Sequence, residues 1–233
     1  MAGNVGNETM KLLRACIAGL TLATALSGCS GGKPAAPIAV APPPSPVVIP
    51  RPEAPTGYAS NFVTPRDAAG RYVTPADGIA PAEALWHVRA GLNVAALACR
   101  QSDLAPAYNA MLSRFSAAFA AADGETKRLY RERFGAEWQK QHDTAMTRLY
   151  NWYAQPFAHA GFCQAAADAL TEAQTLAPEN AATFATTHLA YLSQPFLDGY
   201  RRWDDYKVAE ADWLSRKQAP QATLKLGTVA AAR

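Results

Sequence analysis

A short apolar run over residues 15–26 is followed directly by a proline-rich stretch, and together they confine the folded part of this chain to its later residues. Lys11 and Arg14 precede the run, and two small residues end it. A transmembrane helix needs about 20 apolar residues, so the run is too short to span a bilayer. Positive charge, apolar core and small residues in this order are typical of an export signal. We therefore predict a signal peptide over residues 1–28.

Residues 26–29, Leu-Ser-Gly-Cys, resemble the lipobox of bacterial lipoproteins, in which the cysteine becomes the lipidated first residue of the mature chain. The resemblance implies a membrane anchor at Cys29, because two or more acyl chains hold a protein stably. Ser30 is not the aspartate that favours retention at the inner membrane in such proteins, so the implied location is the outer membrane, facing the periplasm. An ordinary cleaved signal that carries a cysteine is the alternative. Met10 is a candidate start besides Met1.

Composition sets the remaining boundaries. Residues 29–56 are rich in proline and alanine, and proline both fixes φ and lacks an N–H donor, so we predict a disordered linker there. We expect an extended segment over residues 57–80, a helical domain over 81–217 and a disordered tail over 218–233.

The extended segment contains a short internal repeat. Residues 62–67, Phe-Val-Thr-Pro-Arg-Asp, recur as residues 72–77, Tyr-Val-Thr-Pro-Ala-Asp. We expect Phe62 and Tyr72 to anchor this segment on the domain. A ligand-binding loop is the alternative.

Residues 81–217 carry apolar side chains at intervals of three and four, which predicts an all-α domain. Abundant alanine also favours helix. We predict a single disulfide-stapled bundle of about five helices. Their approximate bounds are 81–99, 107–122, 125–155, 161–177 and 178–217. We expect Gly124 to end the second helix and Pro195 to mark a kink or a new start in the last. The third helix has a candidate break near Gly135 or between Gln141 and Thr144.

The four cysteines have different expected fates. Cys16 leaves with the signal and Cys29 takes the lipid, so Cys99 and Cys163 remain. In an exported chain an even pair favours a disulfide. A metal site and a catalytic thiol are the alternatives. We do not favour a metal because no His or Cys is expected at ligand spacing from either cysteine, nor a nucleophile because no local base is written beside it.

Charge and motifs exclude several classes of protein. The net charge is +3, without the clustered basic surface that nucleic-acid binding needs. No hydrolase, zinc-protease, P-loop or dinucleotide motif is present. No two of the histidines, His87, His142, His159 and His188, stand three or four residues apart. We therefore assign no catalytic residue, no metal and no cofactor.

The densest aromatic stretch is the candidate binding site. Trp152 and Tyr153 could stack on a sugar ring or a peptide, with Asn151 as a polar handle. His142 falls in the apolar stripe of the same predicted helix, ten residues before Trp152, and is a candidate partly buried base. Aromatic side chains at helical spacing more often pack in a core, and we favour that interpretation for this stretch, as we favour a hydrogen-bonded histidine at the edge of the core for His142.

A wider resemblance covers about residues 74–177. Residues 90–99, the Tyr108-Asn109 pair and residues 148–151 and 161–163 look like a family of exported helical proteins from alphaproteobacteria. The resemblance supports pairing of Cys99 with Cys163. It implies no activity and no functional residue.

We expect a non-catalytic envelope protein with a structural role or one in recruiting another envelope protein. A small-ligand or glycan-binding module that uses the aromatic stretch is the first alternative. An enzyme acting on cell-wall material is the second, and it requires a carboxylate within hydrogen-bond reach of His142.

Overall fold

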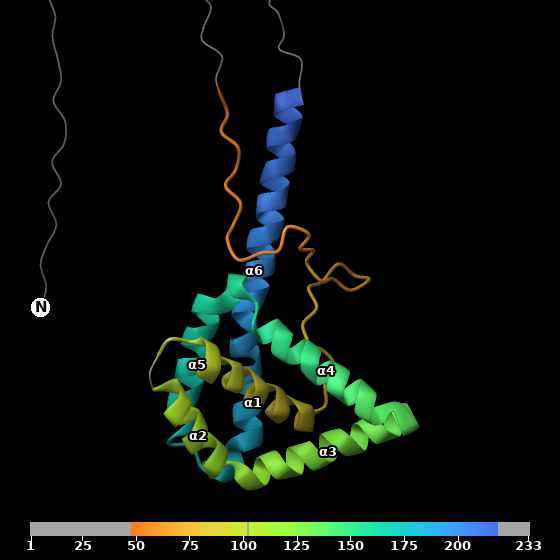
Figure 1. Cartoon of the computed structure of the whole chain (residues 1–233), viewed down its shortest axis with the longest axis vertical. Coiled ribbons are helices and arrows are strands. Elements are labelled where there is room, and N and C mark those ends of the chain that lie inside the picture. Colours follow the sequence, from red (N-terminus) through yellow and green to blue (C-terminus); the bar gives the residue numbers. More distant parts are fainter. Residues whose placement is uncertain (1–47, 102, 219–233) are drawn as a thin grey trace, which may run out of the picture. The chain divides into compact units, whose positions relative to one another are not determined.

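Residues 48–101 and 103–218 are described by a computed structural model, and within them the chain is helical (Figure 1). The α-helices are α1 (Pro81–Ala98), α2 (Leu104–Arg114), α3 (Ser116–Phe134), α4 (Trp138–Tyr153), α5 (His159–Ala173) and α6 (Ala181–Gln218). The short 3₁₀-helices η1 (Gly135–Glu137), η2 (Pro156–Ala158) and η3 (Pro178–Asn180) join α3 to α4, α4 to α5 and α5 to α6. Strand-like pairing in this part of the chain is limited to one bridge between Arg66 and Tyr72. The predicted all-α fold is confirmed.

Several predictions concern residues outside this range. The signal peptide, Cys29 and most of the linker precede residue 48. The predicted tail follows the described residues, except that Gln218 still belongs to α6.

Phe115 divides one predicted helix into two. The sequence predicts a helix over 107–122 that ends at Gly124, but α2 ends at Arg114 and Gly124 lies inside α3. Phe115 is wholly buried, and its φ of −100° and ψ of 19° break the helix there. Its ring packs 5.8 Å from that of Phe184 on α6. Packing of this ring in the core therefore decides the break.

Of the two break positions that the sequence offered, the one near Gly135 is confirmed, whereas α4 runs unbroken from Gln141 to Thr144. Gly135 has a φ of 52°, a left-handed conformation that glycine adopts without the steric cost of a side chain. The chain reverses through η1, and α3 and α4 form a helical hairpin (Figure 1).

Pro195 does not begin a new helix. α6 continues through it for 38 residues in all. Proline removes one intrahelical hydrogen bond. Packing of α6 along α1 and α5 outweighs this loss, with Pro195 placed directly beside Gly161 of α5.

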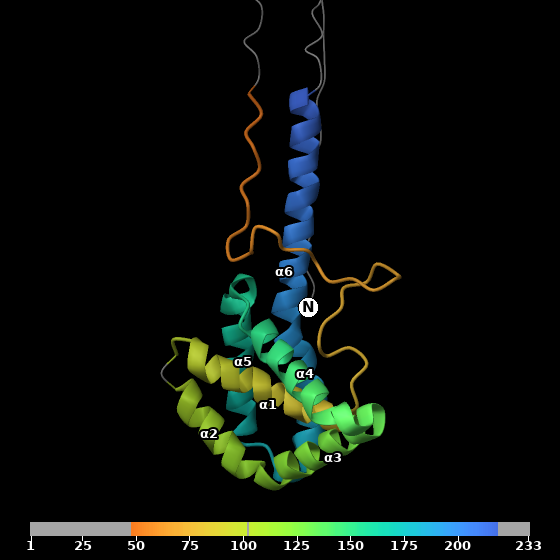
Figure 2. The ribbon, with the colours of Figure 1, turned by 45° about the vertical axis from the view of Figure 1, so that its right-hand side comes forward.

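α1 is the centre of the core. It contacts each of the other α-helices, and Figures 1 and 2 show it crossing the long helix α6. Val88, Leu92 and Ala95 are wholly buried. Small residues allow the close approach: a Cβ at Gly91 would lie 2.8 Å from the ring of Tyr153.

The predicted disulfide is confirmed. Cys99, directly after α1, is bonded to Cys163 on α5, with Cα atoms 5.8 Å apart. This bond holds α1 beside α5, as expected for helices that share a bridge.

The segment before α1 packs along α6. Tyr58 stacks between Phe157 and Trp203, with ring centroids 4.6 and 4.9 Å away. Phe62 and Tyr72 pack against the core, as expected. This segment thereby supplies one wall of the site described next.

Candidate functional site

A cleft of about 750 Å³ opens between the segment before α1 and the α3–α4 hairpin. Its walls come from four parts of the chain: residues 73–79, the first turns of α1, the end of α3 and the second half of α4. Tyr200 of α6 also contributes. Volumes of this size accept small organic ligands.

The second copy of the internal repeat, residues 72–77, forms one wall of the cleft. Asp77 accepts hydrogen bonds from the backbone N–H of Thr74 at 2.6 Å and from its hydroxyl at 3.1 Å. The Thr74 hydroxyl in turn accepts from the N–H of Ala76 at 3.2 Å. These bonds fix the turn whose residues line the cleft. The segment before α1 therefore packs on the domain and also lines a cleft, so the packing role and the ligand-loop role that the sequence offered are compatible.

Glu83 and His87 form the deep part of the cleft at the start of α1. Both are buried, at 6% exposure each. Glu83 accepts a hydrogen bond from the N–H of Ala80 at 2.8 Å, where the positive end of the helix dipole favours a carboxylate. Burial lowers the pKa of His87 to about 4, so its ring is neutral at pH 7. The Nδ1 atom of His87 has no hydrogen-bond partner among the described residues.

Arg133 and Arg148 lie at the exposed part of the cleft wall. Neither forms an ion pair within the described ranges. The carboxylates of the cleft, Asp77 and Glu83, already accept hydrogen bonds from their own segments. The arginines are therefore the charged side chains of the cleft that have neither a hydrogen bond nor an ion pair among the described residues.

Aromatic rings complete the wall. Trp152 donates its indole N–H to the hydroxyl of Tyr200 at 2.8 Å, and both residues line the cleft. Burial raises the pKa of Tyr200, and the bond from Trp152 works against this. Burial, and after it the charge of Glu83, raises the pKa of Tyr130 across the cleft. The phenols are thus neutral hydrogen-bonding groups.

The structure separates the residues that the sequence grouped. Asn151 is exposed and lines the cleft beside Trp152. Tyr153 is instead in the core, where its ring stacks on Phe162 with centroids 5.3 Å apart. Burial raises the pKa of Tyr153, whose hydroxyl has no partner within the described part of the chain.

His142 lies in a different hollow, between α3 and α4, together with Trp86 and Trp138. The carboxylate nearest to it belongs to Asp143, with 3.6 Å between Nδ1 and Oδ1, which is longer than a hydrogen bond. Its ring packs edge-on against Tyr130. His142 and the aromatic stretch therefore do not form one site.

Sequence reasoning missed the two arginines. A continuous helix over 125–155 would separate Arg133 from Arg148 by about 22 Å. The reversal at Gly135 brings both to one cleft. The proposed break at Gly135 was the one signal that could have suggested this.

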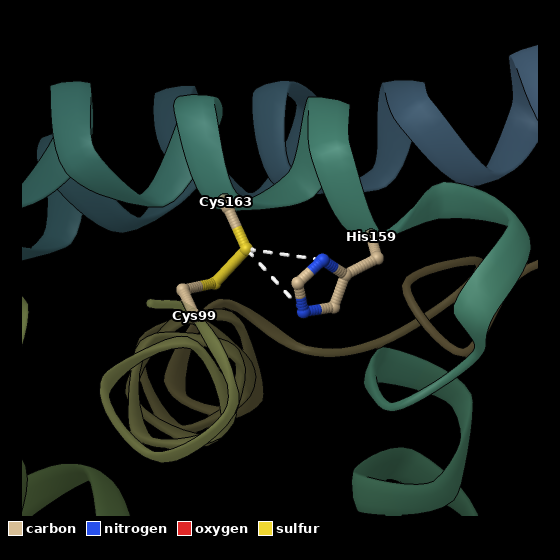
Figure 3. A group of neighbouring side chains, drawn as sticks. All are labelled: Cys99, His159 and Cys163. Carbon is tan, nitrogen blue, oxygen red and sulfur yellow. Dashed lines mark hydrogen bonds between the residues drawn. A yellow bond between two sulfur atoms is a disulfide. The ribbon is translucent and has the colours of Figure 1, made fainter. Parts of the chain in front are cut away.

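The disulfide has a neighbour that was also missed. His159 stands four residues before Cys163, so the statement that no His is at ligand spacing from either cysteine is wrong. One ligand atom from each of Cys99, His159 and Cys163 lies within 4.8 Å of the others (Figure 3).

In the part of the chain that the structure describes, the helices are all too short or too polar to cross a membrane. Comparison of the chain with protein-family models, with curated proteins and with solved structures finds no match.

Proposed function

We propose that this chain is a non-catalytic lipoprotein of the cell envelope whose helical bundle binds an anionic small molecule with an apolar body. The anchor is Cys29, in the outer membrane and facing the periplasm, as the lipobox resemblance implies. The observation that carries the binding role is the cleft in which two arginines, without an ion pair among the described residues, stand beside aromatic and aliphatic side chains.

The charge of the ligand follows from Arg133 and Arg148. A guanidinium presents several N–H donors in a planar fork, which matches the oxygens of a carboxylate, sulfonate or phosphate. Asp77 and Glu83 accept hydrogen bonds from within the fold, and among the described residues neither forms an ion pair with an arginine of the cleft. An anionic group is therefore the complementary partner.

The apolar body follows from the rest of the wall. Ile79, Leu149 and Trp152 line the same cleft, and Tyr130 adds a ring at the end of α3. Removing such surface from water on binding contributes roughly 25 cal/mol per Å². Asn151 and Gln155 provide polar contacts at the edge.

A catalytic role has less support. His142 is outside the cleft and lacks a hydrogen-bonded carboxylate, and His87 is neutral and buried. A general base needs to reach its substrate and to have a suitable pKa. Binding without chemistry agrees better with this arrangement.

The experiment compares two fluorescent probes that share one apolar body. 8-Anilinonaphthalene-1-sulfonate carries a sulfonate, and N-phenyl-1-naphthylamine lacks it. We expect the purified protein to bind the sulfonate at one site, at least tenfold more tightly than the neutral probe. The double variant Arg133→Gln/Arg148→Gln should lose this preference. The exposed Arg100, outside the cleft, provides the control Arg100→Gln, which should change the dissociation constant less than twofold.

Equal affinity for the two probes, or an unchanged preference in the double variant, would contradict an anion site in the cleft. The absence of saturable binding by either probe would overturn the ligand-binding role and favour recruitment of another envelope protein.

A further inference from the structure

The Cys99–Cys163 disulfide has a histidine against one of its sulfurs. His159 is the first residue of α5, and Cys163 follows one helical turn later, so both side chains lie on the same face. Nδ1 of His159 is 3.7 Å from Sγ of Cys163, and Nε2 is 3.8 Å from it. Cys99 reaches the same place from the end of α1 (Figure 3). Two helices thus bring two sulfurs and one imidazole together.

A backbone carbonyl orients the imidazole. Nε2 of His159 lies 3.3 Å from the carbonyl oxygen of Ala98, the last residue of α1. A proton on Nε2 can be donated to that oxygen, which leaves Nδ1 unprotonated and able to bind a metal ion after rotation of the ring. Metal-binding histidines are commonly oriented in this way by a second hydrogen bond.

We propose that reduction converts this disulfide into a Zn²⁺ site formed by Cys99, His159 and Cys163. A dithiol reductant breaks the sulfur–sulfur bond, supplies two electrons and two protons, and leaves as a disulfide. Zn²⁺ then binds both sulfurs as thiolates, and the two thiol protons pass to solvent. Thiolate and imidazole are the ligands that Zn²⁺ prefers, and three protein ligands leave a fourth position for water.

The distances between the ligand atoms are close to those of a zinc site, and side-chain rotations of His159 and of the two cysteines would complete it. With Zn–S bonds of about 2.3 Å and Zn–N bonds of about 2.0 Å, tetrahedral angles place sulfur and nitrogen about 3.5 Å apart and the two sulfurs about 3.8 Å apart. The distance from Cys163 Sγ to His159 Nδ1 is already 3.7 Å. With Cα atoms 5.8 Å apart, the two sulfurs can separate by side-chain rotation after reduction. His159 is exposed, so the ion can enter from solvent.

The test uses the purified protein, reduced and freed of reductant under anaerobic conditions. Zn²⁺ is titrated in competition with a chromophoric chelator. We expect one Zn²⁺ per reduced chain and no competition by the oxidised chain. His159→Ala should weaken Zn²⁺ binding at least tenfold. Gln164→Ala, an exposed neighbour on the same helix, is the matched control and should stay within twofold of wild type.

A second readout covers loss of structure on reduction. Zn²⁺ should raise the thermal midpoint of the reduced wild type and of Gln164→Ala, followed by far-UV circular dichroism, and should raise that of His159→Ala less at the same Zn²⁺ concentration. Equal Zn²⁺ affinity in wild type and His159→Ala would overturn the proposal, because the site would then be an ordinary dithiol. Failure of the reduced wild type to compete for Zn²⁺ would overturn it as well.

Discussion

Gly199 and Gly124 offer one substitution with two opposite expected outcomes. Both glycines lie inside α-helices, Gly199 in α6 and Gly124 in α3. A Cβ at Gly199 would overlap the ring of Phe157, whereas a Cβ at Gly124 would meet no atom within 4 Å. The change to alanine is the same at both positions, so helix propensity cancels in the comparison and the difference reports packing.

The magnitude follows from what surrounds Phe157. Its ring has Tyr58 stacked at 4.6 Å and Phe62 at 5.3 Å, and it is 9% exposed, so it has little room to move. Overpacking of a core costs about 1–3 kcal/mol. Alanine gains about 1 kcal/mol over glycine within a helix. The net effect is the difference of these two terms, so we expect Gly199→Ala to lower the free energy of unfolding by up to about 2 kcal/mol and Gly124→Ala to raise it by about 0.5–1 kcal/mol.

Urea unfolding of the purified protein, followed by far-UV circular dichroism, measures both variants against wild type. The thermal midpoint should fall for Gly199→Ala and rise for Gly124→Ala, by about 2–4 °C per kcal/mol. If Gly199→Ala is as stabilising as Gly124→Ala, the ring of Phe157 does not occupy the space beside Gly199. The stacking of Tyr58 on α6 would then be wrong as well.

Two further predictions concern a titrating group and the anchor. The pKa of His87 is lowered to about 4 by burial, below the 6.5 of the unfolded chain, so its contribution to stability is complete above about pH 6.5 and is lost as the pH falls toward 4. Between pH 7 and pH 5 the wild type should lose about 2 kcal/mol more free energy of unfolding than His87→Gln, as measured by urea unfolding. If the two proteins lose stability in parallel over this range, the His87 ring can be protonated within the folded state. Metabolic labelling with a palmitate analogue should mark the wild type and Cys16→Ser but not Cys29→Ser, and label retained in Cys29→Ser would falsify the lipobox assignment.

Local sequence patterns predicted the helices because the buried face of each helix appears in the sequence as apolar residues at intervals of three and four. Leu85, Val88 and Leu92 recur at helical spacing and are all buried in α1. The Cys99–Cys163 pair was predictable because few cysteines remain once Cys16 and Cys29 are assigned. The helix prediction depends only on residues close together in the chain, and the disulfide prediction depends only on the number of cysteines.

The helix ends were less predictable because distant residues decide them. Phe115 reads as part of a continuous apolar stripe, but the pocket beside Phe184 of α6 holds its ring and interrupts the helix. Pro195 normally breaks a helix, yet the neighbouring helices keep α6 continuous. Propensity is a weak preference, and tertiary packing overrides it.

The sequence by itself determined the helical class and indicated the disulfide, and it offered Gly135 as one of two positions at which α3 and α4 could separate. Only the tertiary structure decided which side chains meet. The reversal at Gly135 brings Arg133 and Arg148 to one cleft, and the same packing places Tyr153 in the core and His142 in a separate hollow. Helical periodicity indicates which face of each helix is buried. A site depends on which faces of different helices lie opposite each other, and packing across the whole core sets this arrangement.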